Sequence, residues 1–291
     1  MKLSEINIYP IKSCHGISLA EAVVEERGLQ FDRRWMLVDE KNRFLTQREY
    51  PVMATLQPEV TSDELRVTRK GGGISVPWDP PATAGGTDTR PGVRVTVWRS
   101  RVDAAVYGDE VNEFFSDAMG ARVRLVTMTE EKRPVNYWYR VHKGDHVSFA
   151  DGYPFLLIGE GSLEELNRRI VENGTNGGAR EPRAARQVPM NRFRPNFVVQ
   201  GSEPFEEDKW KKVRIGSTIF HVVKSCARCP IPTIDQETGE RHSSEPTRTL
   251  ATFRTVRRAG KNKILFGQNL IADAPGGTVH VGDDVEVLER R

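Results

Sequence analysis

Short runs of β-branched and aromatic residues recur along the chain, and only two segments have the apolar spacing of a helix. Turns rich in glycine and proline, such as residues 71–73 and 80–81, separate these runs, which is the pattern of short strands joined by tight turns. A doubly wound parallel sheet requires a helix between successive strands. We therefore predict an α+β fold that is mainly β, with a β-barrel or mixed sheet and few peripheral helices.

The predicted strands form two groups, which a polar segment at residues 127–145 separates. The first group consists of residues 3–8, 19–24, 35–38, 65–67, 93–98 and 104–107. The second group consists of residues 155–158, 196–199, 217–223, 264–266 and 285–288. We accordingly predict two domains, residues 1–122 and residues 123–291.

Two helices are predicted beside these strands. The first spans residues 109–119, where apolar residues recur at the spacing of one buried face and Gly120 is placed to end the helix. The second follows the strand at residues 155–158, and Ser162 and Glu165 have the spacing of a capping box.

Composition and charge narrow the class of protein. Three cysteines in 291 residues are too few for a disulfide framework, and a net charge of +3 is small for a dedicated nucleic-acid binder. The sequence shows neither a signal peptide near Met1 nor an apolar stretch as long as a membrane span. We therefore expect a cytoplasmic protein with reduced thiols, and neither nucleic acid nor a membrane as its partner.

The segment 224–230, Lys-Ser-Cys-Ala-Arg-Cys-Pro, carries the strongest chemical signal in the chain. It follows a predicted strand and contains Cys226 and Cys229, whose thiolates would suit a soft metal. The charges of Lys224 and Arg228 are expected to lower the pKa of a neighbouring thiol. Prolines that follow the motif disfavour the helix that a thioredoxin-like redox pair opens.

Several readings of these cysteines stay open from the residues alone. Free cysteines often act as small buried apolar residues. A structural zinc site needs four ligands, and Cys14 and His15 are candidates to complete one, although no second Cys-x-x-Cys pair is present. The remaining reading is a single thiolate bound to a metal that a cofactor holds.

Basic and hydroxyl residues lie next to several predicted strands. Lys12 and Ser13 follow the first strand, where they would hold an anion or form a solvated turn. Arg33 either pairs with the aspartate before it or forks onto a phosphate. Arg192 and Arg194 would point the same way if their segment is extended, either as an anion clamp or as a solvated face.

Acidic and amide residues are further candidates. Asp235 begins Asp-Gln-Glu-Thr-Gly, which is either a plain turn or an acidic group near a site. Gln268 and Asn269 are expected at the end of a strand, where they would recognise a heterocycle or cap the strand. No dinucleotide fingerprint, phosphate loop, nucleophile elbow or His-Glu-x-x-His motif occurs in the sequence.

Taken together, these segments resemble the MOSC superfamily, named for the C-terminal domain of molybdenum-cofactor sulfurase. The resemblance is to the two-part members, in which an N-terminal MOSC β-barrel domain precedes the MOSC domain, and among them to the mitochondrial amidoxime-reducing component and its bacterial counterparts. It covers essentially the whole chain. The motifs that carry it, in order, are Tyr-Pro-Ile-Lys-Ser-Cys from Tyr9, Asp-Arg-Arg-Trp from Asp32, Phe-Arg-Pro-Asn from Phe193, Cys-Ala-Arg-Cys from Cys226, Asp-x-x-Thr-Gly from Asp235, Phe-Gly-Gln-Asn from Phe266 and Val-Gly-Asp from Val281.

That resemblance implies a molybdenum cofactor, a molybdopterin whose molybdenum is bound by Cys229. The residues that match positions holding the pterin and its phosphate are Lys12, Ser13, Arg33, Arg194, Arg228, Cys229 and Asn269. Asp151 and Asp235 are candidate catalytic residues, as proton relays chosen by their position. Ala227 stands where relatives carry serine, so one hydrogen bond to the cofactor would come from the backbone.

The implied activity is the reduction of an N–O bond in a small N-hydroxylated substrate to the amine and water. The sequence holds no ferredoxin-like domain with further cysteines, so the electrons would come from a separate ferredoxin-, flavin- or cytochrome-type protein. The basic loop at residues 174–188 would either dock an acidic redox partner by electrostatic steering or be a disordered insertion. Two alternatives are a carrier of the cofactor or of persulfide sulfur, and a zinc-stabilised binding module that uses Cys14, Cys226 and Cys229.

Overall fold

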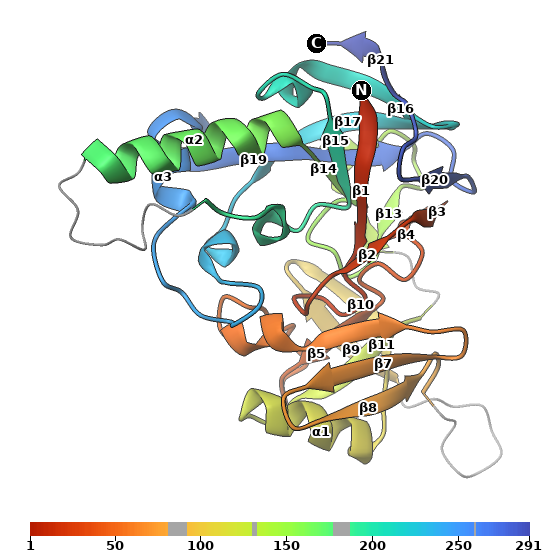
Figure 1. The fold of residues 1–291 in the computed structure, drawn as a ribbon. Coiled ribbons are helices and arrows are strands. Elements are labelled where there is room, and N and C mark those ends of the chain that lie inside the picture. Colours follow the sequence, from red (N-terminus) through yellow and green to blue (C-terminus); the bar gives the residue numbers. More distant parts are fainter. Residues whose placement is uncertain (81–91, 130–132, 177–186, 259) are drawn as a thin grey trace.

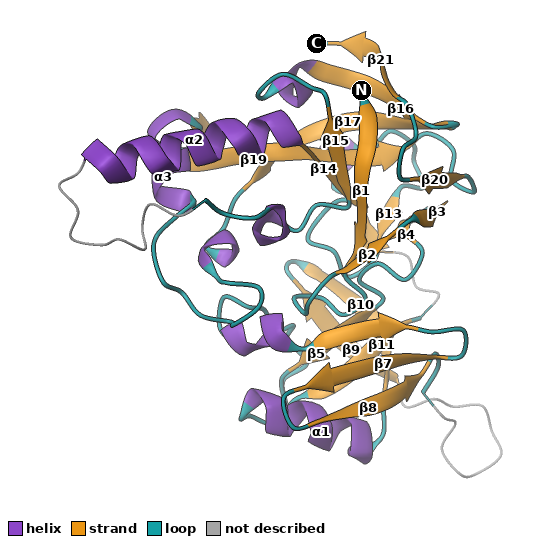
Figure 2. Ribbon diagram, viewed as in Figure 1, coloured by secondary structure: helices purple, strands orange, loops and turns teal. Residues whose placement is uncertain are grey.

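The computed structural model describes residues 1–80, 92–129, 133–176, 187–258 and 260–291, and most of the basic loop predicted at 174–188 lies outside them. The largest element is a nine-stranded mixed sheet (Figures 1 and 2) in the order β2-β1-β15-β14-β19-β17-β16-β21, with β18 paired to β19. Its strands are β1 (Lys2–Ile8), β2 (Ile17–Leu19), β14 (Phe155–Gly159), β15 (Phe197–Gln200), β16 (Trp210–Ile215), β17 (Thr218–Ala227), β18 (Thr255–Arg258), β19 (Lys261–Ala272) and β21 (Val285–Arg290).

This sheet contains strands from both ends of the chain. β1 pairs antiparallel with β15, so that Ile6 lies opposite Phe197, and β14 runs parallel to β15. The first strands are therefore built into the sheet of the second half, and the domain boundary between residues 122 and 123 stays a prediction. A small neighbouring sheet also joins both ends of the chain through β3 (Glu21–Glu25), β4 (Gly28–Leu29) and β20 (Thr278–His280).

A second β unit lies at the other end of the molecule (Figure 1), where α1 packs against two smaller sheets and their apolar core. The order of these sheets is β5-β11-β10-β9 and β6-β7-β8. Their strands are β5 (Trp35–Val38), β6 (Gln57–Val60), β7 (Glu64–Arg69), β8 (Gly72–Pro77), β9 (Gly92–Val97), β10 (Ser100–Val106) and β11 (Arg124–Met128), and a separate hairpin pairs β12 (Arg133–Pro134) with β13 (His146–Val147). The predicted α+β fold, mainly β, is confirmed.

Helices are few and peripheral. α1 (Asp109–Met119) has the predicted bounds, and Gly120 ends it in the left-handed conformation at φ 63°. α2 (Glu160–Asn176) and α3 (Thr247–Phe253) lie together (Figure 1), with α2 against β14 and β15 and α3 against β19. Within the described parts of the chain, none of the helices combines the length and apolar character that crossing a membrane requires. The short 3-10 helices are η1 (Pro51–Thr55), η2 (Tyr137–Tyr139), η3 (Met190–Phe193), η4 (Glu206–Lys209) and η5 (Ile231–Thr233).

β17 and β19 are longer than the sequence pattern predicted. The strand expected at residues 264–266 runs over Lys261–Ala272, so Gln268 and Asn269 lie inside it rather than at its end. Gly267 has a φ of +78°, and the register against β17 shifts in the same region. A glycine inside a strand commonly indicates a bulge or a strand end, which is why the sequence pattern stopped at that point. β17 in turn extends far enough to include Cys226.

The capping box predicted at the start of α2 is not formed. Ser162 Oγ donates to the carboxylate of Glu207, whose two oxygens lie 2.8 Å away. Glu165 instead forms ion pairs with Arg168 and Arg169 on its own helix. A partner that is distant in sequence thus replaces the local cap.

Glu207 is expected to make the stability of the fold depend on pH. The side chain is buried, and burial raises its pKa to about 7 against the opposing hydrogen bond from Ser162. The folded protein then holds a proton that the unfolded chain releases near pH 4.5, so stability should fall as pH rises from about 4.5 to about 7. The upper limit of this loss is about 3 kcal/mol.

Urea unfolding across this pH range measures the effect. Glu207→Gln should flatten that part of the profile, because an amide does not titrate. The exposed neighbour Glu203 provides the matched control, and Glu203→Gln should leave the profile of the natural chain unchanged. An identical slope in the Glu207→Gln variant would show that other groups govern the dependence.

Candidate functional site

An open cavity lies where the loop after β1, the segment before β14 and the end of β17 meet. Its wall takes residues from both predicted halves of the chain. The described residues that line it are Lys12, Ser13, Arg33, Arg48, Ala150, Asp151, Gly152, Tyr153, Phe155, Leu156, Arg192, Phe193, Arg194, Asn196, Cys226, Ala227, Arg228, Cys229, Ile231, Pro232 and Asn269.

All the residues predicted to bind a cofactor are brought together in this wall, and Asp151 joins them. Asp235 is not among the described residues that line the cavity. Its carboxylate accepts a 2.7 Å hydrogen bond from Nη2 of Arg192 and closes a turn by accepting from the backbone N–H groups of Glu237 and Thr238. Asp235 therefore contacts the cavity wall through Arg192, and its catalytic role stays a prediction.

Three residues of the wall hold a left-handed backbone that residues other than glycine rarely adopt. The φ angle is 68° at Ser13, 50° at Arg33 and 56° at Arg194. Because Arg194 ends the 3-10 helix η3, the extended segment considered for Arg192 and Arg194 is wrong. Strained backbone that clusters at one cavity is typical of a ligand site.

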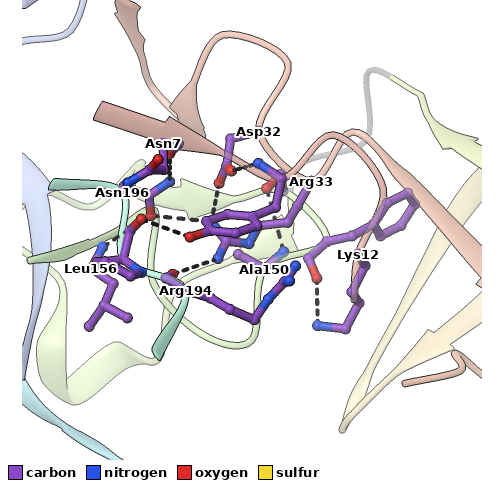
Figure 3. Close-up of polar contacts among 12 residues, drawn as sticks. Asn7, Lys12, Asp32, Arg33, Ala150, Leu156, Arg194 and Asn196 are labelled. Atoms are coloured by element: carbon purple, nitrogen blue, oxygen red, sulfur yellow. Dashed lines mark hydrogen bonds and ion pairs between the residues drawn. The ribbon is translucent and has the colours of Figure 1, made fainter. Parts of the chain in front are cut away.

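Two guanidinium groups lie over the ring of Tyr9. The distance to the ring centroid is 4.5 Å for Arg33 and 4.1 Å for Arg194. Arg33 also forms the local ion pair with Asp32, at 2.6 Å, and donates to the Oδ1 atom of Asn196 at 3.2 Å (Figure 3). Burial raises the pKa of Tyr9 to about 12, so the ring stays neutral and its face attracts both cations.

Arg228 is held by backbone carbonyls. Its Nε donates to the Phe266 carbonyl at 2.8 Å and its Nη1 to the Phe193 carbonyl at 2.9 Å. Gly267 leaves the necessary space, because a Cβ there would lie 2.7 Å from Cγ1 of Ile158 and 3.3 Å from Nη2 of Arg228. Both the positive φ and the close approach therefore require glycine at this position.

Lys12 is a buried ammonium that faces Asp151. Its Nζ lies 2.5 Å from Oδ1 of Asp151 and 2.9 Å from the Phe149 carbonyl. Burial lowers the pKa of Lys12 to about 8, and Asp151 opposes that shift. Burial alone would raise the pKa of Asp151, but Lys12 holds it well below the usual range. The indole of Trp98 donates to the same carboxylate oxygen at 3.2 Å.

A buried amide pair that the sequence did not indicate joins two sides of the cavity. Gln47 and Gln236 donate to each other at 3.0 Å. Gln47 also donates to the Ser13 carbonyl at 2.8 Å, and Gln236 accepts from Nη1 of Arg194 at 3.2 Å. The two glutamines are 189 positions apart, so no local sequence pattern could have revealed the pair.

Two family models match this chain. The MOSC N-terminal beta barrel domain matches residues 1–122, and the MOSC domain matches residues 144–286. The chain belongs to the MOSC family. The resemblance drawn from the seven sequence motifs is thereby confirmed.

Relatives of two kinds match this MOSC chain. Mitochondrial amidoxime-reducing component 1 of Mus musculus is 30% identical over 301 residues, which cover 98% of this chain and 82% of that protein. The Homo sapiens protein of the same name is 27% identical over 303 residues, with the same two coverages. Molybdenum cofactor sulfurase of Oryza sativa subsp. japonica is 31% identical over 272 residues, which cover 91% of this chain and 32% of the sulfurase. The MOSC chain thus spans about a third of that sulfurase.

The cavity of this MOSC chain fits the family's molybdenum cofactor, which carries a phosphate and a polar heterocycle. Two arginines of the wall that match cofactor-binding positions each keep a buried nitrogen without a partner among the described residues. These nitrogens are Arg194 Nη2 and Arg228 Nη2. Burial lowers the pKa of Arg194 to about 10, which leaves the side chain charged at neutral pH. Buried cationic donors are costly unless an acceptor pairs with them.

The three cysteines of the MOSC chain do not share one site. Cys226 and Cys229 line the cavity, whereas Cys14 is buried in an apolar cluster with Ile11 and Trp35. Throughout the described residues, no three His, Cys, Asp or Glu side chains are placed to hold a metal ion together. The three thiols therefore do not assemble the zinc site considered from the sequence.

Burial governs the thiol of Cys226. It raises the pKa of that thiol, against the charges of Arg228 and Lys224. Both cations lower the pKa of this thiol as expected, but desolvation outweighs them, so the pKa is raised overall. The ammonium of Lys224 lies instead over the ring of Tyr139, 4.3 Å from its centroid.

Proposed function

We propose that this MOSC chain holds a molybdenum cofactor in the cavity and reduces N-hydroxylated compounds to the amine and water. In this proposal Cys229 is the metal ligand. The pterin and its phosphate are held by Lys12, Ser13, Arg33, Arg194, Arg228 and Asn269. The reduction consumes two electrons and two protons for each N–O bond that is broken. The amidoxime-reducing relatives support this reaction class.

The observation that carries the proposal is the set of unpaired guanidinium groups on residues that line the same cavity as Cys229. Arg194 and Arg228 both line the cavity, and Nη2 of each is buried and has no partner among the described residues. The planar guanidinium group matches the geometry of a phosphate, to which it donates paired hydrogen bonds. A phosphate therefore supplies the acceptors that these donors lack.

The surrounding residues supply position and protons. When bound, the molybdenum cofactor supplies a metal that cycles by two electrons. Carbonyl contacts and the Tyr9 ring fix the guanidinium groups, so the chain binds and orients rather than performing the electron chemistry itself. Of the two candidates for proton relay only Asp151 lines the described cavity wall, and because Lys12 lowers the pKa of that carboxylate, the proton it would pass on is that of the Lys12 ammonium.

Electrons are proposed to come from a separate ferredoxin-, flavin- or cytochrome-type protein. The sulfurase relatives favour a second candidate function, in which the chain carries the cofactor or a sulfur atom to another enzyme. The two functions differ in turnover, because a carrier releases its cargo and reduces no substrate.

Metal and pterin analysis of the natively expressed chain, followed by a reduced-dye assay with an aryl amidoxime, tests the proposal. We expect stoichiometric molybdenum and dye oxidation that depends on the amidoxime. If the chain is expressed in a host that makes the cofactor and is purified without molybdenum, cofactor binding is contradicted. Reversible cofactor release without turnover would favour the carrier.

A further inference from the structure

The wall of the cavity carries more positive charge than its carboxylates balance. Six of the described lining residues are basic and one, Asp151, is acidic. Three of the basic residues have a carboxylate partner, since Lys12 pairs with Asp151, Arg33 with Asp32 and Arg192 with Asp235. Within the described residues the other three form no ion pair. These are Arg48, Arg194 and Arg228.

Arg194 and Arg228 belong to one side of the cavity. Nη1 of Arg228 donates to the carbonyl of Phe193, the residue that precedes Arg194. Nη2 of Arg33 donates to the carbonyl of Arg194 at 3.4 Å. A phosphate monoester carries a charge of about −1.5 to −2 at neutral pH, so the phosphate assigned to this side balances these two guanidinium groups.

Arg48 belongs to the side that the N-terminal half provides. Its guanidinium lies over the ring of Trp98, with Cζ 4.6 Å from the ring centroid. Trp98 is 44% exposed, and its indole donates a hydrogen bond to Asp151, the carboxylate that also pairs with Lys12. Nε of Arg48 is buried and has no acceptor in the described part of the chain. Stacking on an indole orients a guanidinium without using its donors.

We propose that Arg48, which lines this cavity and is held over the ring of Trp98, forms a second anion-accepting subsite that receives a carboxylate or phosphate group of the substrate. The inference rests on the proposed reductase function and names its substrate class, which is an N-hydroxylated compound with an acidic group. After one phosphate has been placed on Arg194 and Arg228, Arg48 is the lining guanidinium that still forms no ion pair within the described residues, because the nearby Asp151 pairs with Lys12.

Steady-state reduction of paired aryl amidoximes, one with a ring carboxylate and one without, tests the subsite. In Arg48→Gln we expect KM for the acidic compound to rise about tenfold, the loss of one charge-assisted hydrogen bond, with kcat unchanged. KM for the neutral compound should stay constant, and Arg48→Lys should recover part of the affinity. Arg43→Gln is the matched control, because Arg43 is an exposed arginine whose ion pair with Asp39 lies outside the cavity wall.

Binding and metal measurements separate this proposal from the one on which it rests. Calorimetric titration of the loaded protein with a carboxylated aryl amidine needs no turnover, and a phosphorylated aryl amidine distinguishes the two anions. About tenfold weaker binding of either amidine to Arg48→Gln supports the subsite even if no amidoxime is reduced. The subsite is contradicted if Arg48→Gln changes KM equally for both amidoximes, or if it leaves amidine binding unchanged. A loss of molybdenum from Arg48→Gln would also overturn it, because Arg48 would then be a cofactor contact.

Discussion

Replacement of Cys229 by alanine is expected to remove both the molybdenum and the amidoxime reduction. Cys229 lies two residues beyond the end of β17, in the loop that lines the cavity. Cys226 lies inside that strand, and burial raises the pKa of its thiol. A metal binds the thiolate form, so Cys226→Ala should keep at least part of both properties. Loss of the ligand should lower turnover on the order of 100-fold or more, since even residues that only support a ligand cost 10–100-fold.

To identify the metal ligand, the molybdenum content per chain and the dye-coupled turnover are measured in both variants. The matched pair controls for the loss of a cavity-lining thiol, because both cysteines line the same wall. Thermal unfolding of the cofactor-free chains confirms that each variant folds. Full turnover by Cys229→Ala, or equal losses in both variants, would contradict the assignment of the ligand.

Local sequence patterns predicted those elements whose determinants are themselves local. The bounds of α1 followed from apolar spacing and from Gly120, which ends the helix through its own backbone conformation. Many of the strands followed from alternation and turn residues, but β6, β8 and β16 were not predicted, and β8 begins within the turn expected at residues 71–73. β19 was missed beyond Phe266 because Gly267 interrupts the alternation, although pairing with β17 on one side and β14 on the other carries the strand past it.

The same distinction between local and tertiary determinants applies to the site. Its residue types were predicted from local motifs, because thiolate sulfur suits a soft metal and a guanidinium group suits a phosphate. Their conformations were not, since the left-handed backbone of Arg194 and the raised pKa of Cys226 arise from tertiary burial. The capping box failed for a similar reason, because Glu207 reaches Ser162 from 45 positions away.

Gln47 and Gln236 are expected to be coupled in stability and to position Arg194. Their amides are buried and donate to each other. Either single change to methionine keeps the volume but removes both hydrogen bonds between the two amides, while Gln47 keeps the Ser13 carbonyl and Gln236 keeps Arg194. A hydrogen bond contributes about 0.5–1.5 kcal/mol net, so each single variant should lose about 1–3 kcal/mol of stability. The double variant should lose less than the sum, by about 1 kcal/mol or more.

Urea unfolding of the four cofactor-free proteins gives the coupling energy, and strictly additive losses would contradict it. Asn167→Leu is the control for loss of a buried amide, since Asn167 exchanges two hydrogen bonds with the backbone of Val188, and neither residue lines the described wall. It should lower stability without changing the retention of molybdenum.

Retention of molybdenum during dialysis separates a positioning role from a merely structural one. Gln236 accepts from Nη1 of Arg194, which leaves Nη2 of that arginine for the cavity. In Gln236→Met the guanidinium loses this partner and is free to turn, so the cofactor should dissociate about tenfold faster, as expected for one hydrogen bond to a charged group. Gln47→Met keeps the contact between Gln236 and Arg194 and should have the smaller effect. If the retention of molybdenum simply tracks the free energy of unfolding across all the variants, Gln47 and Gln236 have only a structural role in the core.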